Sequence, residues 1–414
     1  MTSATGSAQE GQTGPEAVRL PGRLVAQGDD IADGVVVLRG ERVAYAGPTT
    51  GLPPELASAA VPAGWRDDLV LLPGLVDIHC HGAAGGEFGA GLDEGRRAAL
   101  HHLARGTTTL VGSIASRVPD DLVRAVGEVA TLAADGVLAG AHLEGPFLSD
   151  ARRGAQNPAA LSDVDPELVA RAVDAAERAG GPILHLSYAP ERDLEGDLPA
   201  LLARQGIVAD VGHTDADAAV VAAALDAVRR SAPRGGRPLV THLFNGMPPL
   251  HHRSPGPVAA ALAAAGRGDA VVELIGDGVH LSAATVRMVF DTVGPRSIAL
   301  VTDAMAACGM PDGRYLLSRL DVTVEDGVAR LSEGGSIAGG TATLLDVVRW
   351  TVQEAGVSLA DAVLAATATP AEALALPAGR LRPGDRADLV VTSDALELVL
   401  VLRAGRVVTG AARD

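Results

Sequence analysis

The chain contains no lysine, so all 34 of its lysine-plus-arginine residues are arginine. This absence excludes chemistry that needs a lysine amine, namely Schiff-base catalysis, attachment of pyridoxal phosphate, the lysine-dependent phosphate loop and a metal bridge of carboxylated lysine. Aromatic residues make up only 2% of the chain, too few for the stacking platforms that grip polysaccharides or single-stranded nucleic acid. We therefore expect a small polar substrate.

Cysteines and long apolar runs are also scarce. The two cysteines, Cys80 and Cys308, cannot form a disulfide framework in a chain of 414 residues, which favours the reducing cytoplasm. No uncharged apolar run reaches the roughly 18 residues of a membrane span. Glu10 and Glu16 stand where a signal peptide would be basic. A net charge of −17 argues against nucleic acid and anionic membranes as partners.

Composition and hydrophobic pattern divide the chain into four segments. Residues 1–16 are small, polar and non-periodic, and we interpret them as a disordered tail. Residues 17–70 and 377–414 contain short β-like runs split by glycine and proline, and we predict that together they build a small β-sandwich domain. Residues 71–376 alternate apolar, β-rich runs with alanine-rich segments of helical length.

Eight apolar, β-rich runs occur in the central segment. They are residues 75–81, 107–114, 137–144, 183–189, 207–213, 239–244, 271–276 and 297–303. Alanine-rich segments of helical length separate most of them, for example at 121–134, 166–179, 216–230 and 283–293. Eight such units predict a (β/α)8 TIM barrel of the α/β class rather than an open sheet. After the eighth run we expect a hairpin at 316–331, followed by helices at 343–354 and 359–375.

Residues of the types that bind metals stand at or near the ends of five of these runs. His79 and His81 are two positions apart, a spacing that puts both imidazoles on one face of a strand. The full set is His79, His81, Glu144, His213, His242 and Asp303. The carboxyl ends of barrel strands lie on one face, where the active sites of this fold occur. We therefore expect six ligand-type side chains at one mouth.

Each of these residues alone could be a strand-end cap or a satisfied polar group of the core. Four histidines and two carboxylates at one rim are poorly explained in that way, because buried imidazoles and carboxylates need partners. We therefore predict a divalent metal site, with Glu144 between the two histidine pairs and Asp303 opposite. A metal lowers the pKa of water toward about 7, and a nearby carboxylate can take the proton and pass it to a leaving group. This is hydrolysis chemistry.

Loop residues near the same mouth are candidates for substrate binding. Asn245 can bond hydroxyls and His280 can donate to an anion or a polarised carbonyl, although a structural loop histidine is the alternative for His280. Arg253 is a candidate phosphate clamp, against the alternative of a solvated surface arginine. For His142 and His185, within the third and fourth runs, we favour structural roles.

With these motifs the chain resembles the amidohydrolase superfamily, and within it most closely the family of N-acetylglucosamine-6-phosphate deacetylases. The resemblance covers residues 20–408. It is carried by Pro-Gly-Leu-Val-Asp-Ile-His-Cys-His-Gly at 73–82 and by segments 142–147, 212–214, 241–247, 277–280 and 301–304. It implies removal of the acetyl group from N-acetyl-D-glucosamine 6-phosphate in amino-sugar catabolism or cell-wall recycling, by a homodimer or a dimer of dimers.

The resemblance also implies roles for single residues. Glu144, His213 and His242 would hold the principal divalent metal, with zinc expected and iron as the alternative, and Asp303 would be the general base and then acid. His79 and His81 make a second metal plausible, so one or two ions are expected per subunit. The residues expected around the sugar are Ala155, Gln156, Asn245, Gly246, His280, Ile337, Ala338 and Gly339. Arg253 would reach a phosphate bound in the neighbouring subunit.

One residue departs from the pattern of that family. Gln156 stands where the family usually has a histidine that contacts the substrate, and glutamine can donate a hydrogen bond but cannot become cationic. Three alternatives stay open: an N-acetylgalactosamine-6-phosphate deacetylase, another amidohydrolase that needs no lysine, and a metal-free barrel without activity.

Overall fold

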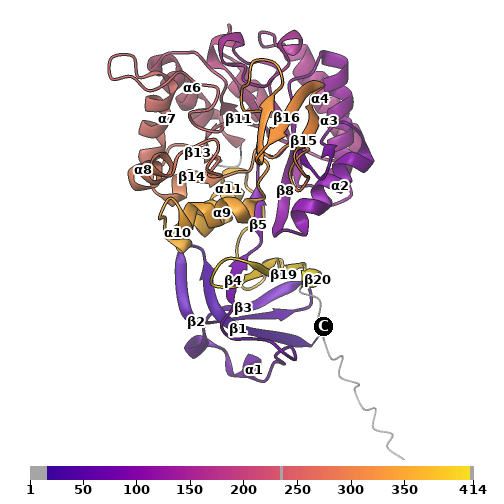
Figure 1. Ribbon diagram of the computed structural model, residues 1–414, viewed down its shortest axis with the longest axis vertical. Helices are drawn as coiled ribbons and strands as arrows, with labels where there is room; N and C mark the ends of the chain where they lie inside the picture. The colour runs from indigo at the N-terminus through magenta and orange to yellow at the C-terminus, as the bar shows by residue number, and fades with distance from the viewer. Residues whose placement is uncertain (1–15, 234–235, 411–414) are drawn as a thin grey trace, which may run out of the picture.

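The computed structural model describes residues 16–233 and 236–410. A barrel of parallel strands wrapped by helices carries a smaller β domain at one end (Figure 1). Except for Glu16, the tail expected at 1–16 lies outside the described residues. None of the described helices is long and apolar enough to cross a membrane.

Both chain ends build the smaller domain. Its strands are β1 (Ala17–Ala26), β2 (Asp29–Arg39), β3 (Arg42–Pro48), β4 (Val70–Pro73), β18 (Leu389–Thr392), β19 (Leu398–Arg403) and β20 (Arg406–Gly410), and a short helix α1 (Pro54–Ala57) follows β3. The structure differs from the expected sandwich in one respect. All seven strands are hydrogen-bonded into one sheet, in the order β20-β19-β18-β4-β1-β2-β3. The strand β4 joins the halves by pairing with β1 and β18, so neither half leaves an edge strand open at the junction.

The eight predicted barrel strands are confirmed in the predicted order. They are β5 (Leu75–Asp77), β8 (Thr107–Ala115), β9 (Gly140–Glu144), β10 (Ile183–Tyr188), β11 (Val208–Val211), β12 (Leu239–Val240), β13 (Val271–Leu274) and β14 (Ile298–Leu300). Each pairs parallel with the next in sequence. Beyond the strand ends, a bridge between Cys80 and Ala304 closes the ring, and Thr302 Oγ1 donates to the Asp77 carboxylate at 2.6 Å.

The barrel interior changes from apolar to polar along the strands. Val208 and Val271 belong to an apolar cluster inside the barrel, into which the short helix α11 (Ala368–Ala373) also packs. Two positions further along the same strands come Asp210 and Glu273, both fully buried. Because side chains alternate along a strand, positions two apart face the same interior. The polar side chains are thus gathered toward the carboxyl ends of the strands.

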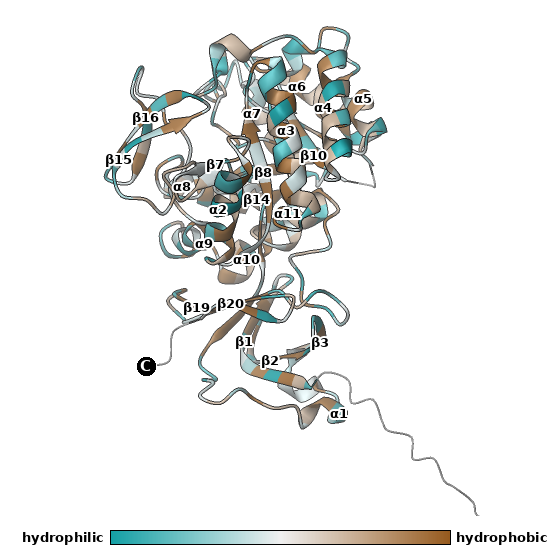
Figure 2. Ribbon diagram, turned by 90° about the vertical axis from the view of Figure 1, so that its right-hand side faces the viewer, coloured by the Kyte–Doolittle hydropathy of each residue, from teal (hydrophilic) through white to brown (hydrophobic). Residues whose placement is uncertain are grey.

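Helices cover the outside of the barrel. They are α2 (Leu92–Leu103), α3 (Pro119–Ala134), α4 (Pro166–Ala179), α5 (Leu198–Arg204), α6 (Ala218–Ser231), α7 (Gly256–Gly266), α8 (Ala283–Val293), α9 (Leu344–Gln353) and α10 (Leu359–Ala365). Proline begins α3 and α4, and Asp165 caps the amino end of α4. Hydrophilic residues mark the outer faces of both helices in Figure 2. The single helix expected at 359–375 is divided into α10 and α11.

Three strands, rather than the expected hairpin at 316–331, follow the last barrel strand. These strands, β15 (Gly313–Leu317), β16 (Leu320–Glu325) and β17 (Val328–Leu331), form an antiparallel sheet in that order. The turn between β16 and β17 is an Asp-Gly pair with positive φ at Asp326 and Gly327, which suits a tight hairpin turn. The turn between β15 and β16 is Ser318 and Arg319, residue types that do not signal a left-handed turn, and so β15 was not expected.

Candidate metal centre and substrate pocket

All six predicted ligand-type side chains meet at the carboxyl end of the barrel strands. Glu144 ends β9, and the other five lie two to four residues beyond their strands. His213, His242 and Asp303 have φ values of 46°, 24° and 46°. Such left-handed backbone is unusual for residues other than glycine and is often found at functional sites. It turns the chain sharply where each strand ends.

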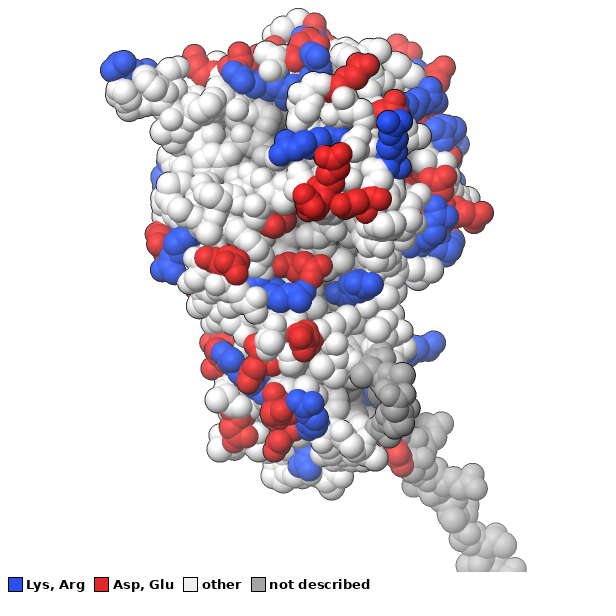
Figure 3. Space-filling model, in the orientation of Figure 1, with Lys and Arg blue, Asp and Glu red and all other residues white. Residues whose placement is uncertain are grey.

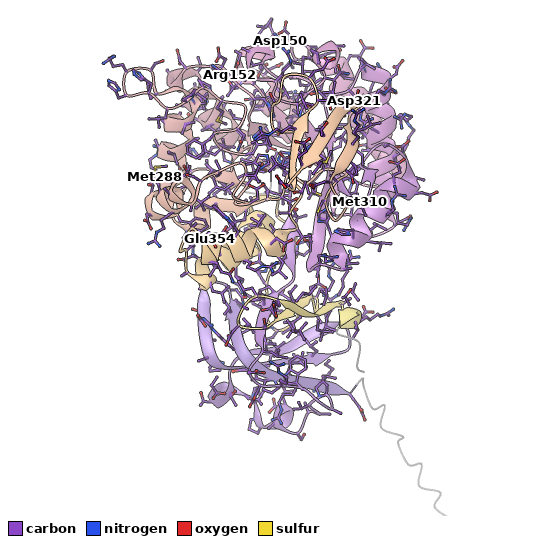
Figure 4. All side chains as sticks on the ribbon, viewed as in Figure 1. Asp150, Arg152, Met288, Met310, Asp321 and Glu354 are labelled. Atoms are coloured by element: carbon purple, nitrogen blue, oxygen red, sulfur yellow. The ribbon has the colours of Figure 1, made fainter. Side chains whose placement is uncertain are left out.

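Glu144 is the centre of the cluster. Its Oε1 lies 3.0 Å from Nε2 of both His213 and His242, and its Oε2 lies 3.2 Å from Nε2 of His81. The Nδ1–H of His213 donates to the carbonyl of Arg152 at 2.7 Å. Arg152 is labelled near the top of the barrel in Figure 4. With Nδ1 protonated, the Nε2 lone pair of a neutral His213 faces the carboxylate.

The paired histidines and Asp303 lie on the other side of Glu144. His79 Nε2 is 3.3 Å from His81 Nε2 and 3.7 Å from Glu144 Oε1. Asp303 Oδ1 lies 3.2 Å from His81 Nε2 and 3.5 Å from His79 Nε2. One carboxylate therefore stands between two pairs of imidazoles, and a second carboxylate faces the first pair.

Glu273 also belongs to the cluster, and the sequence interpretation missed it. Its Oε2 accepts from Nδ1 of His79 at 2.9 Å and from the backbone N–H of His242 at 3.1 Å. A carboxylate on the far nitrogen fixes the tautomer of a ligating histidine and the direction in which its other nitrogen points. The signal was present, because Glu273 is the one charged residue in the apolar run Val271–Leu274. Alternation with Val271 places it inside the barrel.

The carboxylates make the cluster a strong attractor of positive charge. Burial opposes protonation of His79 and His81, yet the neighbouring carboxylates raise the pKa of His79 to about 9 and that of His81 to about 10. Burial acts against ionisation of Asp303, but the hydrogen bond with His81 and the charges of His79 and His81 outweigh it and lower its pKa to about 2. Glu144 follows the same pattern, with hydrogen bonds from three histidines holding its pKa well below the usual range.

The donor set fits a divalent metal of the transition series. Among the described residues, His79, His81 and Glu144 form one group whose ligand atoms lie within 4.8 Å of one another, and Glu144, His213 and His242 form another. His79 and His213 have the far ring nitrogen held by a hydrogen bond, so their Nε2 lone pairs converge on carboxylate oxygens. Positive charge stabilises this arrangement, supplied either by protons on the imidazoles or by a metal ion, and imidazole with carboxylate suits zinc or iron.

A pocket of about 320 Å³ opens above the cluster. The predicted substrate residues that line it are Ala155, Gln156, Asn245, Gly246, His280, Ile337 and Gly339. His280 Nδ1 lies 2.8 Å from Asp277 Oδ2; burial opposes protonation of His280, but Asp277 raises its pKa. A Cβ at Gly246, where φ is 60°, would lie 2.7 Å from His213 Nδ1, so only glycine lets the loop approach this imidazole.

Gln156 contacts the cluster directly. Its Oε1 accepts from the backbone N–H of Ser116 at 2.7 Å, which fixes the orientation of the amide, and its Nε2 then donates to Glu144 Oε2. This glutamine thus holds Glu144 as well as lining the pocket.

Two predicted substrate residues do not line the pocket. Ala338 is fully buried and packs with Met305 in a cluster beneath the three-stranded sheet. Arg253 lies in the exposed segment 249–254, where its Nη1 contacts the ring of His252 at 2.8 Å.

His142 and His185 lie just below the cluster and are held by polar partners. Their rings stack at 3.9 Å with an angle of 3°. The His142 nitrogens contact Ser113 Oγ and Ser187 Oγ at 2.9 Å, while His185 contacts Asp210 and the carbonyl of Ile78. With both nitrogens of both rings engaged, neither histidine offers a lone pair to the mouth.

Comparison with known proteins gives consistent results. A family model described as the amidohydrolase family matches residues 70–408. The chain is 32% identical over 400 residues to an N-acetylglucosamine-6-phosphate deacetylase of Bacillus subtilis (strain 168), covering 93% of this chain and 95% of that one. It is 31% identical over 345 residues to an N-acetylgalactosamine-6-phosphate deacetylase of Escherichia coli O157:H7, covering 80% and 86%.

A solved structure resembles the whole fold. It is a mutant N-acetyl-D-glucosamine-6-phosphate deacetylase from Mycobacterium smegmatis in complex with N-acetyl-D-glucosamine-6-phosphate. The two chains are 39% identical and superpose with a TM-score of 0.86, covering 95% of this chain and 99% of the other.

Proposed function

Because this chain belongs to the amidohydrolase family, we propose that it is a metal-dependent deacetylase that converts N-acetyl-D-glucosamine 6-phosphate and water into D-glucosamine 6-phosphate and acetate. The observation that carries the proposal is the convergence of Glu144, His213, His242 and Asp303 beneath a pocket at the mouth of the barrel. The proposed setting is amino-sugar catabolism or cell-wall recycling.

The proposed metal ligands are the two groups that share Glu144. Glu144, His213 and His242 would hold the principal ion, and His79 and His81 would hold a second one with the same carboxylate. Zinc is the proposed metal, with iron as the alternative that the same ligands accept. A bound divalent cation would polarise the amide carbonyl and lower the pKa of a nearby water molecule.

Asp303 is the proposed acid and base. Its low pKa keeps it ionised at neutral pH, so a carboxylate oxygen can take a proton from the attacking water. The water oxygen bonds to the acetyl carbon, the carbon–nitrogen bond breaks, and Asp303 returns the proton to the departing amine nitrogen. Acetate and the free amine result. Gln156 would act by holding Glu144, and His280 would donate to a carbonyl or hydroxyl oxygen.

One experiment tests the proposed function. Purified protein is expected to release acetate from N-acetylglucosamine 6-phosphate and to lose activity after dialysis against a chelator, with recovery when zinc is restored. The same steady-state assay with N-acetylgalactosamine 6-phosphate separates the alternative that the Escherichia coli relative represents. Full activity in a sample shown by metal analysis to be metal-free would contradict the proposed metal mechanism.

The proposed partner is a second copy of this chain. Arg253 is exposed and does not line the pocket of its own subunit. Its position supports the proposal that it reaches the phosphate of a substrate bound in the neighbouring subunit. No continuous basic face is visible in Figure 3, where acidic and basic side chains are interspersed. The face in this view therefore lacks the continuous basic surface that a nucleic-acid backbone requires. Both cysteines are unpaired and buried, which supports the cytoplasm as the proposed compartment.

Arg253→Ala is expected to raise KM for the phosphorylated sugar by at least about tenfold, since a hydrogen bond to a charged group contributes about 1.5–3 kcal/mol. The KM for unphosphorylated N-acetylglucosamine should not change. Arg267→Ala is a matched control, because it removes an exposed arginine paired with Asp269 at the end of α7. An unchanged preference for the phosphorylated sugar would show that Arg253 is not the phosphate residue.

A further inference from the structure

The three-stranded sheet β15–β17 forms one wall of the substrate pocket. It stands off the barrel on the same side as β7 (Gly86–Glu87) (Figure 2). Leu317, at the end of β15, lines the pocket together with Ile337 and Gly339, which follow β17. The segment after β17 is held next to Asp303, because the N–H of Gly340 donates to the carbonyl of Asp303 at 2.7 Å. This contact anchors one side of the sheet.

The other anchor is the turn between β15 and β16. Ser318 and Arg319 at this turn have φ values of 44° and 75°, a left-handed backbone that neither residue type favours. The backbone N–H of Ser318 donates to both carboxylate oxygens of Glu87, at 3.2 and 3.1 Å, and its hydroxyl lies 3.3 Å from Oε1. A charged acceptor on this N–H offsets the cost of the strained turn.

Glu87 is in turn held by a buried arginine. Arg117 Nη2 lies 2.6 Å from Glu87 Oε1, and the two residues are only 8% and 9% exposed. Glu87 ends β7, in the segment that joins β5 to β8, Arg117 lies two residues after β8, and Ser318 lies in the turn between β15 and β16. The three contacts therefore join three separate segments on the catalytic face, and none of the three residues belongs to the metal cluster.

We infer that Glu87 and Arg117 are a positioning pair that fixes the β15–β17 sheet over the substrate. The residue before Ser318, Leu317, packs with Met305 and lines the pocket. Movement of the turn would carry Leu317 away from the mouth. The part of this inference that concerns substrate rests on the proposed function; the part that concerns the sheet does not.

Hydrogen exchange with steady-state kinetics tests the inference. Glu87→Gln places an amide between two donors, Ser318 N–H and Arg117, and the double variant Glu87→Met with Arg117→Met removes the pair without leaving a buried unpaired charge. Glu128→Gln is the matched control, because it weakens an ion pair between two residues of α3, Arg124 and Glu128. All proteins are measured with full metal content.

Both pair variants are expected to exchange backbone amides of residues 313–325 at least about tenfold faster than wild type, with barrel strands unchanged. KM for the sugar phosphate should rise about fivefold to tenfold, the factor that one ordinary hydrogen bond corresponds to. The value of kcat should change by less than about twofold, and the Glu128→Gln control should match wild type throughout.

Two results would overturn the inference. Unchanged exchange in the double variant would show that the pair does not hold the sheet, and faster exchange with unchanged KM would show that the pair has no positioning role. If wild type turns over neither sugar phosphate, the proposed function is wrong. Faster exchange confined to the sheet in the pair variants would still support the role of Glu87 and Arg117 in holding the sheet.

Discussion

Asp303→Asn is expected to lower kcat for N-acetylglucosamine 6-phosphate by at least about a hundredfold, the lower end of what a positioned acid or base contributes. The reason is chemical, because an amide cannot accept the proton of water at neutral pH or return it to the amine. Metal analysis of the same sample should show wild-type metal content, since His79, His81, Glu144, His213 and His242 are untouched. KM should change little.

The substitution of Asp303 by asparagine should leave the local backbone conformation and its hydrogen bonds unchanged. Asp303 has φ of 46°, a conformation that asparagine tolerates better than most residues. Its backbone N–H donates to the carbonyl of His79 and its own carbonyl accepts from Gly340, and neither contact involves the side chain. Asp321→Asn, which makes the same change at an exposed acid on β16 (Figure 4), is the control and should keep wild-type turnover. More than a tenth of wild-type kcat in Asp303→Asn with full metal would assign the proton transfer to another group.

The catalytic mouth could be predicted because strand connectivity alone determines it. In a parallel barrel every strand ends on the same face, so His213, His242 and Asp303 needed only to be recognised as strand ends. Their partners did not have to be known. The same reasoning explains why all eight strands were found, since alternation of apolar β-rich runs with helical segments is a local property of the sequence.

The residues that were missed act over long distances in the sequence. Glu273 is 194 residues from His79, and no local pattern states that the two are hydrogen-bonded. Gln156 was expected around the sugar, and the loop after β9 also brings its amide onto Glu144 and Ser116. Such contacts depend on how loops fold over the barrel, which spacing does not encode.

Departures in the fold also depend on contacts between residues that are far apart in the sequence. The turn at Ser318 and Arg319 has no glycine or asparagine to signal its left-handed backbone, and its stabilising acceptor, Glu87, comes from a loop 231 residues away. A hairpin was therefore expected where three strands occur. In the smaller domain, β4 joins strands from both chain ends into one sheet, and a four-residue strand does not reveal which neighbours it will pair with.

Glu144→Gln is expected to have the largest effect on metal content. A glutamine has one oxygen, so its NH2 group must face either His213 and His242 or the side of His81 and Gln156. Gln156 cannot turn to compensate, because its oxygen is held by Ser116. Bound metal should fall by at least about tenfold and turnover by about a hundredfold, since loss of even an outer partner of a metal ligand typically costs 10–100-fold.

The number of ions lost decides how Glu144 is shared. If wild type holds two ions per subunit, loss of both in Glu144→Gln supports a carboxylate common to the His79–His81 pair and the His213–His242 pair, as its distances to both pairs suggest. Loss of one ion would confine Glu144 to a single site, and retention of full metal content would contradict its role as a ligand. Glu354→Gln, the same change at an exposed residue after α9 (Figure 4), is the control for any general effect of removing an acid. Circular dichroism of each variant must match wild type, because a buried carboxylate with three histidine partners also contributes to packing of the mouth.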